Sequence, residues 1–195
     1  IGAQIIASQD ILASVADSNL DQWRLEIARA GSDQYALLAE GRNTVNGAIF
    51  QLDPARYDTG FYQLRLTASD VGGRLGQAQV DLELAASQKQ GEYLRSETDF
   101  SFTLGGHTLD FTRRYDSLDA ATQGSFGYGW NLTLRDLRIE TDVPLTGSEA
   151  SGVYNPLRMG SRLYIDTPTG ERVGFTFAPQ QTSGKGYSYW TPAWV

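Results

Sequence analysis

Apolar and polar residues alternate with a period of two along most of this chain. Successive side chains of a β-strand point to opposite faces, so this period predicts strands with one buried face. Turn-forming residues rich in Gly, Asp and Asn separate the alternating segments at short intervals. This pattern predicts an immunoglobulin-like antiparallel β-sandwich in the first half of the chain. The strands are expected at 3–7, 11–16, 22–29, 34–39, 47–52, 61–68 and 76–84.

Two aromatic residues sharpen the prediction of a sandwich. Tyr62 begins the sixth expected strand directly after a tight turn, where a tyrosine corner anchors a strand connection through its hydroxyl group. Trp23 lies on the third expected strand, in the position of the usual core indole. We expect both side chains in the sandwich core. The alternative is that they fill a core at unrelated positions.

The second half of the chain follows a polar boundary. Residues 85–95 lack alternation, which indicates a linker, and we assign 1–86 to the sandwich, 87–95 to the linker and 96–195 to a second antiparallel β region. The dipeptide Gly105-Gly106 predicts a two-residue hairpin turn. The remaining strands are expected at 100–104, 107–115, 126–135, 136–142, 161–166 and 171–177, with a turn at 168–170 and an aromatic end at 186–190. The expected fold class is therefore all-β throughout.

The sequence FGYGW at 126–130 alternates aromatic residues and glycines. In one extended strand, Phe126, Tyr128 and Trp130 share a face, while Gly127 and Gly129 leave the other face bare. Burying an aromatic ring removes roughly 150–250 Å² from water at about 25 cal/mol per Å², so burial in a sheet assembly is favoured. The alternative is an exposed platform for a sugar.

The composition limits which binding partners and which catalytic or metal sites are expected. The formal net charge of -7 opposes binding to nucleic acid, and no run of about 18 apolar residues is present, so no membrane span is expected. Cysteine is absent and His107 is the single histidine, so neither thiolate chemistry nor a His or Cys metal site is expected. We assign no catalytic residue, metal ligand or cofactor, and expect no enzymatic activity.

Acidic residues leave two weaker hypotheses open. Asp17, Asn19 and Asp21, or Asp116 and Asp119, offer oxygen ligands for calcium, but their spacing matches no EF-hand, and solvated turns are the default interpretation. A glycosidase with paired carboxylates is the third choice of function, because nothing in the sequence selects a pair among the 23 acidic residues.

The segment TRRYDSLDAATQGSFGYGWNLTLRDLRI at 112–139 resembles the start of the shell in RHS/YD-repeat proteins. The resemblance rests on an Arg-x-Tyr-Asp-Ser pattern followed, after a short loop, by Gly-x-Phe-Gly-x-Gly-Trp. The preceding sandwich is similar to the immunoglobulin- or fibronectin-like module that often comes before the repeats. The matching residues are Arg113 or Arg114, Tyr115, Asp116, Ser117, Gly124, Phe126, Gly127, Gly129 and Trp130.

The resemblance implies a structural segment of a large bacterial protein that is secreted or displayed at the cell surface. In that family, YD repeats form a hollow β-shell that encloses and delivers a C-terminal toxin or effector. The implied partners are the remainder of the shell and its enclosed effector, with a cell-surface glycan or protein as a further candidate. This chain carries one YD-type unit in place of an array. The alternative function is a surface adhesion or carbohydrate-binding module, with Tyr189, Trp190 and Trp194 presented to a glycan.

Overall fold

The computed structural model describes residues 2–133, 135–167, 172–184 and 186–195. The described residues form strands in several antiparallel sheets, with single-turn 3-10 helices at Pro54–Arg56 (η1), Ser117–Asp119 (η2) and Glu149–Ser151 (η3). This confirms the all-β prediction. The chain divides into two compact units, Ile1–Gly91 and Glu92–Val195, and the division falls within the segment predicted as a linker. The turn expected at 168–170 lies outside the described residues.

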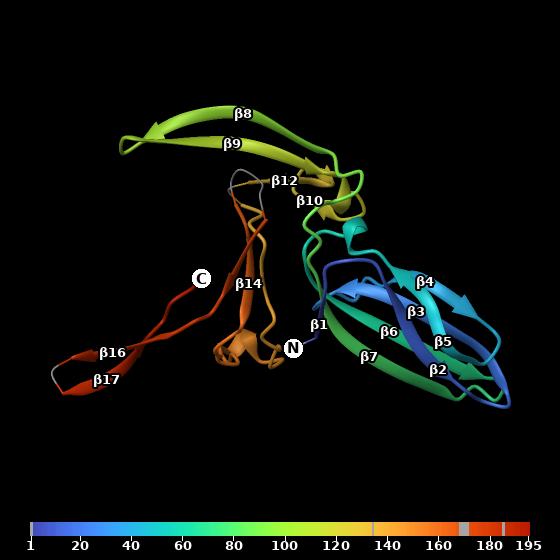
Figure 1. Ribbon diagram of the computed structural model, residues 1–195. Helices are drawn as coiled ribbons and strands as arrows, with labels where there is room; N and C mark the ends of the chain where they lie inside the picture. Colours follow the sequence, from blue (N-terminus) through green and yellow to red (C-terminus); the bar gives the residue numbers. More distant parts are fainter. Residues whose placement is uncertain (1, 134, 168–171, 185) are drawn as a thin grey trace. The chain divides into compact units, whose positions relative to one another are not determined.

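The first unit consists of two sheets that face each other (Figure 1). The larger sheet has the order β1-β7-β6-β3-β4, in which β1 runs parallel to β7 and the other neighbours are antiparallel; the smaller sheet pairs β2 with β5. This is the arrangement of an immunoglobulin-like sandwich. Its strands are β1 (Ala3–Ile5), β2 (Gln9–Val15), β3 (Leu20–Arg29), β4 (Ala36–Gly41), β5 (Val45–Leu52), β6 (Gly60–Asp70) and β7 (Leu75–Leu84), each overlapping one predicted segment.

The core of the first unit lies between the two sheets. It is formed by Ile5, Leu25, Ile27, Leu52, Tyr62, Leu64, Leu82 and Leu84. Trp23 is also buried, and its indole N–H donates to the carbonyl of Asn43 at 3.1 Å. A Cβ atom on Gly41, the residue opposite Trp23 on β4, would stand 2.6 Å from the indole ring. Only glycine therefore leaves room for the indole at this position.

Tyr62 forms a tyrosine corner at the start of β6. Its hydroxyl group donates to the carbonyl of Asp58, four residues upstream, at 2.9 Å, and the bond is buried. The Asp58 carboxylate in turn accepts from Arg29 Nη2 at 2.9 Å, which ties the turn before β6 to the end of β3. The connection into β6 is thus held by a backbone and a side-chain bond to the same residue.

Replacing Tyr62 by phenylalanine should lower the free energy of unfolding of the first unit by about 1–2 kcal/mol, because a buried carbonyl loses its donor. Urea unfolding followed by circular dichroism measures the loss. Tyr35→Phe is the control, because that hydroxyl binds the side chain of Gln63, which also has Gln79 and Asp81 as partners. An equal loss in both variants would contradict a special role for the corner.

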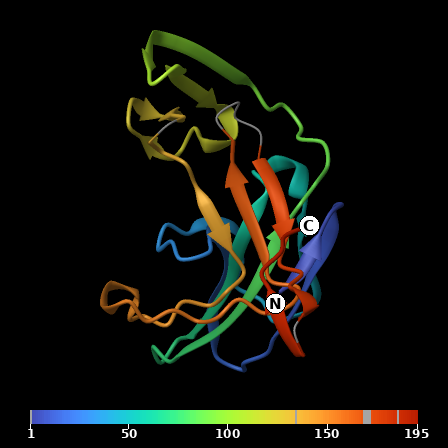
Figure 2. The ribbon, with the colours of Figure 1, turned by 90° about the vertical axis from the view of Figure 1, so that its left-hand side faces the viewer.

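The described residues of the second unit form four small sheets. The long hairpin of β8 (Leu94–Leu104) and β9 (His107–Asp116) is visible in both ribbon views (Figure 1, Figure 2). Gly105 and Gly106 form its turn with φ of 59° and 83°, as the dipeptide predicts. The strand β12 (Trp130–Leu132) pairs with β9. The other sheets are β10 (Gln123–Gly124) with β11 (Gly127–Tyr128), β13 (Ile139–Thr141) with β14 (Arg162–Asp166) and β15 (Arg172–Thr176), and β16 (Gln180–Gly184) with β17 (Tyr187–Thr191).

Two expectations for the second unit, the end of the linker and the strand at 126–135, are corrected. The linker ends before Leu94, because Leu94 and Arg95 already pair with β9. The single strand expected at 126–135 is wrong, because Gly127 and Gly129 have φ of 110° and 73° and divide it into β11 and β12. The strand β16 was not expected. Its side chains are exposed on both faces, so no alternation of apolar and polar residues marks it.

Candidate functional site

The segment with the Arg-x-Tyr-Asp-Ser and Gly-x-Phe-Gly-x-Gly-Trp patterns forms a compact joint. We call it the return joint and define it as residues 113–133 and 135–136. After Asp116 the chain passes through η2 and the β10–β11 hairpin, and it returns as β12 antiparallel to β9, with Trp130 opposite Tyr115. The N–H of Asp116 donates to the carbonyl of Gly129 at 3.0 Å, and the N–H of Gly129 donates to Thr122 at 2.9 Å. The joint therefore closes through backbone hydrogen bonds.

Two glycines permit the close approach of backbone segments within the return joint. A Cβ atom on Gly124 would lie 2.1 Å from the carbonyl oxygen of Trp130 and 2.2 Å from Oδ1 of Asn131. A Cβ atom on Gly129 would lie 2.7 Å from the ring of Tyr115. Gly127, by contrast, has open space around its Cβ position. Thus Gly124 and Gly129 are required for packing, and Gly127 for its backbone conformation.

The aromatic side chains of the joint divide into two groups. Trp130 is half-buried and packs on Tyr115 with ring centroids 5.4 Å apart, and Tyr115 contacts Tyr93 at 6.2 Å. Phe126 and Tyr128 are 49% and 64% exposed, so the prediction that these two rings are buried is wrong. The physical reason is the break at Gly127 and Gly129, which removes the three rings from a common strand face.

The Arg-Tyr-Asp-Ser part of the motif ends β9. The Asp116 carboxylate accepts from the N–H of Leu118 at 2.9 Å and caps η2, and Arg114 forms an ion pair with it at 3.8 Å. Ser117 bonds to Tyr93 twice: its Oγ accepts from the Tyr93 N–H at 2.8 Å, and its N–H donates to the Tyr93 carbonyl at 3.1 Å. These polar residues direct the chain away from β9 and attach the turn to the start of β8.

An ion-pair network, not expected from the sequence, connects the return joint to the sheet of β13, β14 and β15. Asp119, buried in η2, pairs with Arg138 Nη1 at 3.3 Å. Arg138 Nε also lies 3.4 Å from Glu140 and 3.5 Å from Asp166, and Arg172 Nη2 lies 2.7 Å from Glu140. The network places alternating charges along one face of the β13-β14-β15 sheet. Through the pair of Arg138 with Asp119, it reaches the return joint.

Asp136 closes the other side of the joint. Its carboxylate accepts from the N–H of Leu132 at 2.9 Å and from Ser125 Oγ at 2.8 Å. Partial burial raises the pKa of Asp136, but the hydrogen bonds from Leu132 and Ser125 and the charge of Arg135 outweigh it. The net pKa is lowered, which means that the ionised form stabilises the folded state.

Replacing Asp136 by asparagine should lower the free energy of unfolding of the second unit by about 1 kcal/mol at pH 7. Because the folded pKa is depressed, the stabilisation by Asp136 is complete above the unfolded pKa of about 3.9 and is lost as the pH falls through the folded value. Urea unfolding at pH 7 and in acid should therefore give converging stabilities for the two proteins. The exposed control Glu92→Gln should change neither value, and a constant difference at all pH values would contradict the assignment.

The other candidate residues of the sequence do not converge. His107 is exposed at the start of β9. Asp17 accepts from the N–H of Asn19 at 2.7 Å, and Asp116 and Asp119 are engaged as described above. Among the described residues, no group of three His, Cys, Asp or Glu side chains could hold a metal ion, and no helix is long and apolar enough to cross a membrane.

Fold and site together define a two-unit all-β protein with an immunoglobulin-like sandwich and a second antiparallel region. Residues 87–153 match the family described as Domain of unknown function (DUF6531), and this range contains the whole return joint. The description of that family assigns no activity. No curated protein and no solved structure matches the chain.

Proposed function

We propose that this chain is a non-enzymatic structural segment of a larger RHS/YD-repeat protein. In this proposal, the sandwich precedes the first strands of a β-shell, and the shell of the parent protein encloses and delivers a C-terminal toxin or effector. The parent would be a bacterial protein that is secreted or displayed at the cell surface. The observation that carries the proposal is the return joint, whose motif residues bond to backbone and to one another and thereby fix how β12 pairs with β9.

The sheet β12-β9-β8 has one aromatic face and one polar face, as expected for a sheet in the wall of a shell. One face carries a row of aromatic rings: Phe100 stacks on Phe111 with centroids 4.3 Å apart and lies 6.4 Å from Phe102. On the same face, the guanidinium of Arg113 lies 5.6 Å from the ring centre of Trp130. The opposite face is polar, with a Thr98–Thr112 hydroxyl contact at 3.0 Å. Such a two-faced sheet is suited to separate an interior from an exterior.

The hairpin also has an edge that can continue a sheet. In the described part of the chain, β8 pairs with β9 alone, and Phe100 and Phe102 are substantially exposed beside that edge. An unpaired edge next to apolar side chains favours the addition of another strand. A hairpin with few packed neighbours is marginally stable in water, so further strands would stabilise it. The proposed shell supplies them.

The test is to express the gene together with its downstream coding sequence and to image the product by electron microscopy. The expected result is a hollow particle with residues 94–132 in its wall, and a downstream sequence with tandem YD units. A second sample with Phe100→Lys and Phe102→Lys should fail to close, whereas the control Thr103→Lys on the polar face should close. A downstream sequence without such units, or a particle in which 94–132 lie free, would contradict the proposal.

A second candidate function is carbohydrate binding by the β16–β17 hairpin. Tyr187, Tyr189 and Trp190 on β17 are largely exposed, and Thr182 and Gln181 on β16, which lie opposite Tyr189 and Trp190, are neutral hydrogen-bonding residues. Exposed rings beside neutral polar groups suit stacking on a sugar. A glycan array with the Trp190→Ala and Trp130→Ala variants separates the two functions. Retained folding with lost sugar binding would favour this candidate, and lost folding in the Trp130 variant would favour the structural role.

A further inference from the structure

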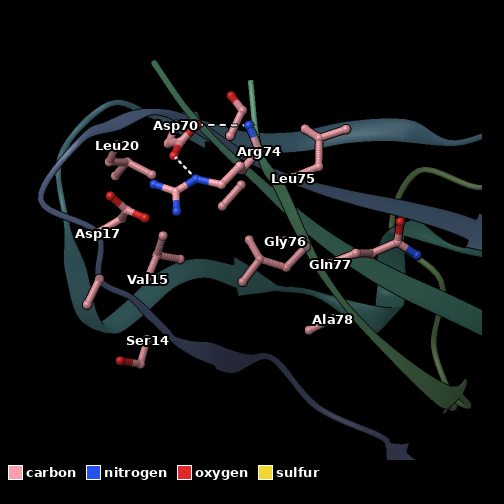
Figure 3. A pocket seen from close by; sticks show the side chains of 14 residues that line it. Ser14, Val15, Asp17, Leu20, Asp70, Arg74, Leu75, Gly76, Gln77 and Ala78 are labelled. Carbon is pink, nitrogen blue, oxygen red and sulfur yellow. Dashed lines mark hydrogen bonds and ion pairs between the residues drawn. The ribbon is translucent and has the colours of Figure 1, made fainter. Parts of the chain in front are cut away.

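The sandwich of the first unit is open along one side, between β2 and β7. Two hollows of about 460 and 420 Å³ lie there, and both are lined by Ser14, Leu66 and Ala78. We call this continuous space the seam groove. Figure 3 shows the first hollow, with Val15 and Leu20 on one side and Gly76 and Ala78 on the other.

Small residues explain why the seam groove is not filled. At the closed end of β7, the inward side chains Leu82 and Leu84 are almost completely buried. Toward the start of β7, the inward positions on the same face are Val80, Ala78 and Gly76. Of these, Ala78 lies opposite Leu66 of β6 and Gly76 lies opposite Ala68. Val80 is 59% exposed although it points toward the other sheet. Side chains from outside the unit would thus find both space and apolar contact.

Both strands that border the seam groove have unpaired edges. Within the described residues, the outer edge of β7 is paired by β1 at Leu82–Leu84 and Gly2 lies against the Asp81 backbone, while the stretch 75–79 has no neighbour there. In the same part of the chain, the strand β2 pairs with β5 alone. The N–H and C=O groups of an unpaired edge bind an extended chain by backbone hydrogen bonds, and alternate side chains of that chain then enter the groove.

The charged residues of the seam groove are mainly acidic. Asp10 and Asp17 lie at its two ends, near the start of β2 and just beyond its end. Asp70 is already bound, since its carboxylate accepts from the Arg74 N–H at 2.8 Å and from Arg74 Nε at 2.6 Å. The whole chain carries -7, which opposes a second copy of itself as the occupant and favours basic groups.

We propose that the seam groove binds an extended peptide segment of another protein, which adds as a strand to the 75–79 edge of β7. Its inward residues are apolar and its flanking residues are basic. The backbone edge recognises the extended conformation, the small-residue trough accepts the apolar side chains, and Asp10 and Asp17 attract the flanks. This surface is independent of the return joint and of the proposed shell.

The test uses the full chain and a fluorescent synthetic peptide of alternating valine and threonine with lysine at both ends. Fluorescence anisotropy should show saturable binding, and hydrogen exchange should show new protection within 75–79. Ala78→Phe, which fills the trough, should weaken binding by about tenfold or more. The matched control Val71→Phe adds the same ring at an exposed position outside the groove and should leave binding unchanged. Thermal melting verifies that both variants fold.

A charge exchange tests the flanks. The same peptide with glutamate ends should bind at least about tenfold more weakly, and the double variant Asp10→Lys, Asp17→Lys should reverse that preference. Absence of saturable binding, equal weakening by Val71→Phe, or new protection confined to residues outside 75–79 would overturn the proposal. So would a dimer of the unliganded chain with protected 75–79, because the occupant would then be a second copy.

Discussion

Replacing Gly124 by alanine is expected to destabilise the second unit by about 3 kcal/mol or more and to open the return joint. The added methyl group would meet the backbone carbonyl oxygen of Trp130 at 2.1 Å and Oδ1 of Asn131 at 2.2 Å, and a backbone carbonyl cannot yield without a shift of its strand. The strand β12 would have to move away from β10, which would weaken its pairing with β9. Urea unfolding measures the stability. Hydrogen exchange at the Asp116 amide, which donates to Gly129, reports the opening of the joint.

The matched control is Gly127→Ala in the same turn. Gly127 has φ of 110° but nothing within 4 Å of its Cβ position, so alanine there causes backbone strain without a clash. That strain should cost about 1–2 kcal/mol. Equal losses at Gly124 and Gly127 would show that the joint is not closely packed, and they would remove the observation on which the structural proposal depends.

The alternation of apolar and polar residues predicted the first unit well because that pattern reports one-sided burial. Leu25, Ile27 and Leu64 belong to the core, and the polar residues Arg24, Glu26 and Arg65 that alternate with them are less buried. In the second unit, β8, β16 and β17 are largely exposed on both faces, and glycines interrupt 126–132, so the same signal is weak there. The strand β16, with the sequence QQTSG, is the clearest case.

The return joint could be predicted in composition but not in conformation. The residue types at 113–130 indicated a specific structure, yet the positions of Phe126 and Tyr128 depend on positive φ angles at two glycines. Glycine in sequence shows that such angles are allowed, not that they are adopted. The pairing of Asp119 with Arg138 was also beyond prediction, because the two residues are separated by a hairpin and follow no period. The seam groove did leave a signal, since Gly76 and Ala78 occupy inward positions of a strand.

Replacing Arg172 by methionine is expected to cost the second unit about 3 kcal/mol or more. The Arg172 side chain is 8% exposed and pairs with both Asp166 and Glu140, whose side chains are 21% and 18% exposed. Removing the guanidinium leaves the partly buried carboxylates of Glu140 and Asp166 with fewer cationic partners. It also removes the contact between the guanidinium and the ring of Tyr164, whose centre is 5.6 Å away. The loss should change little with salt, because buried pairs are poorly screened. Urea unfolding at low and high salt measures both effects.

Arg95→Met is the matched control, because Arg95 pairs with Glu97 in the same unit but their side chains are 57% and 44% exposed. An exposed pair contributes about 0–1 kcal/mol, so this variant should be close to the wild type. A triple variant, Arg172→Met with Glu140→Leu and Asp166→Leu, should recover most of the loss, since it removes the stranded carboxylates while Arg138 keeps Asp119. If Arg172→Met alone were as stable as the wild type, the pairs of Arg172 with Glu140 and Asp166 would not stabilise the sheet of β13, β14 and β15.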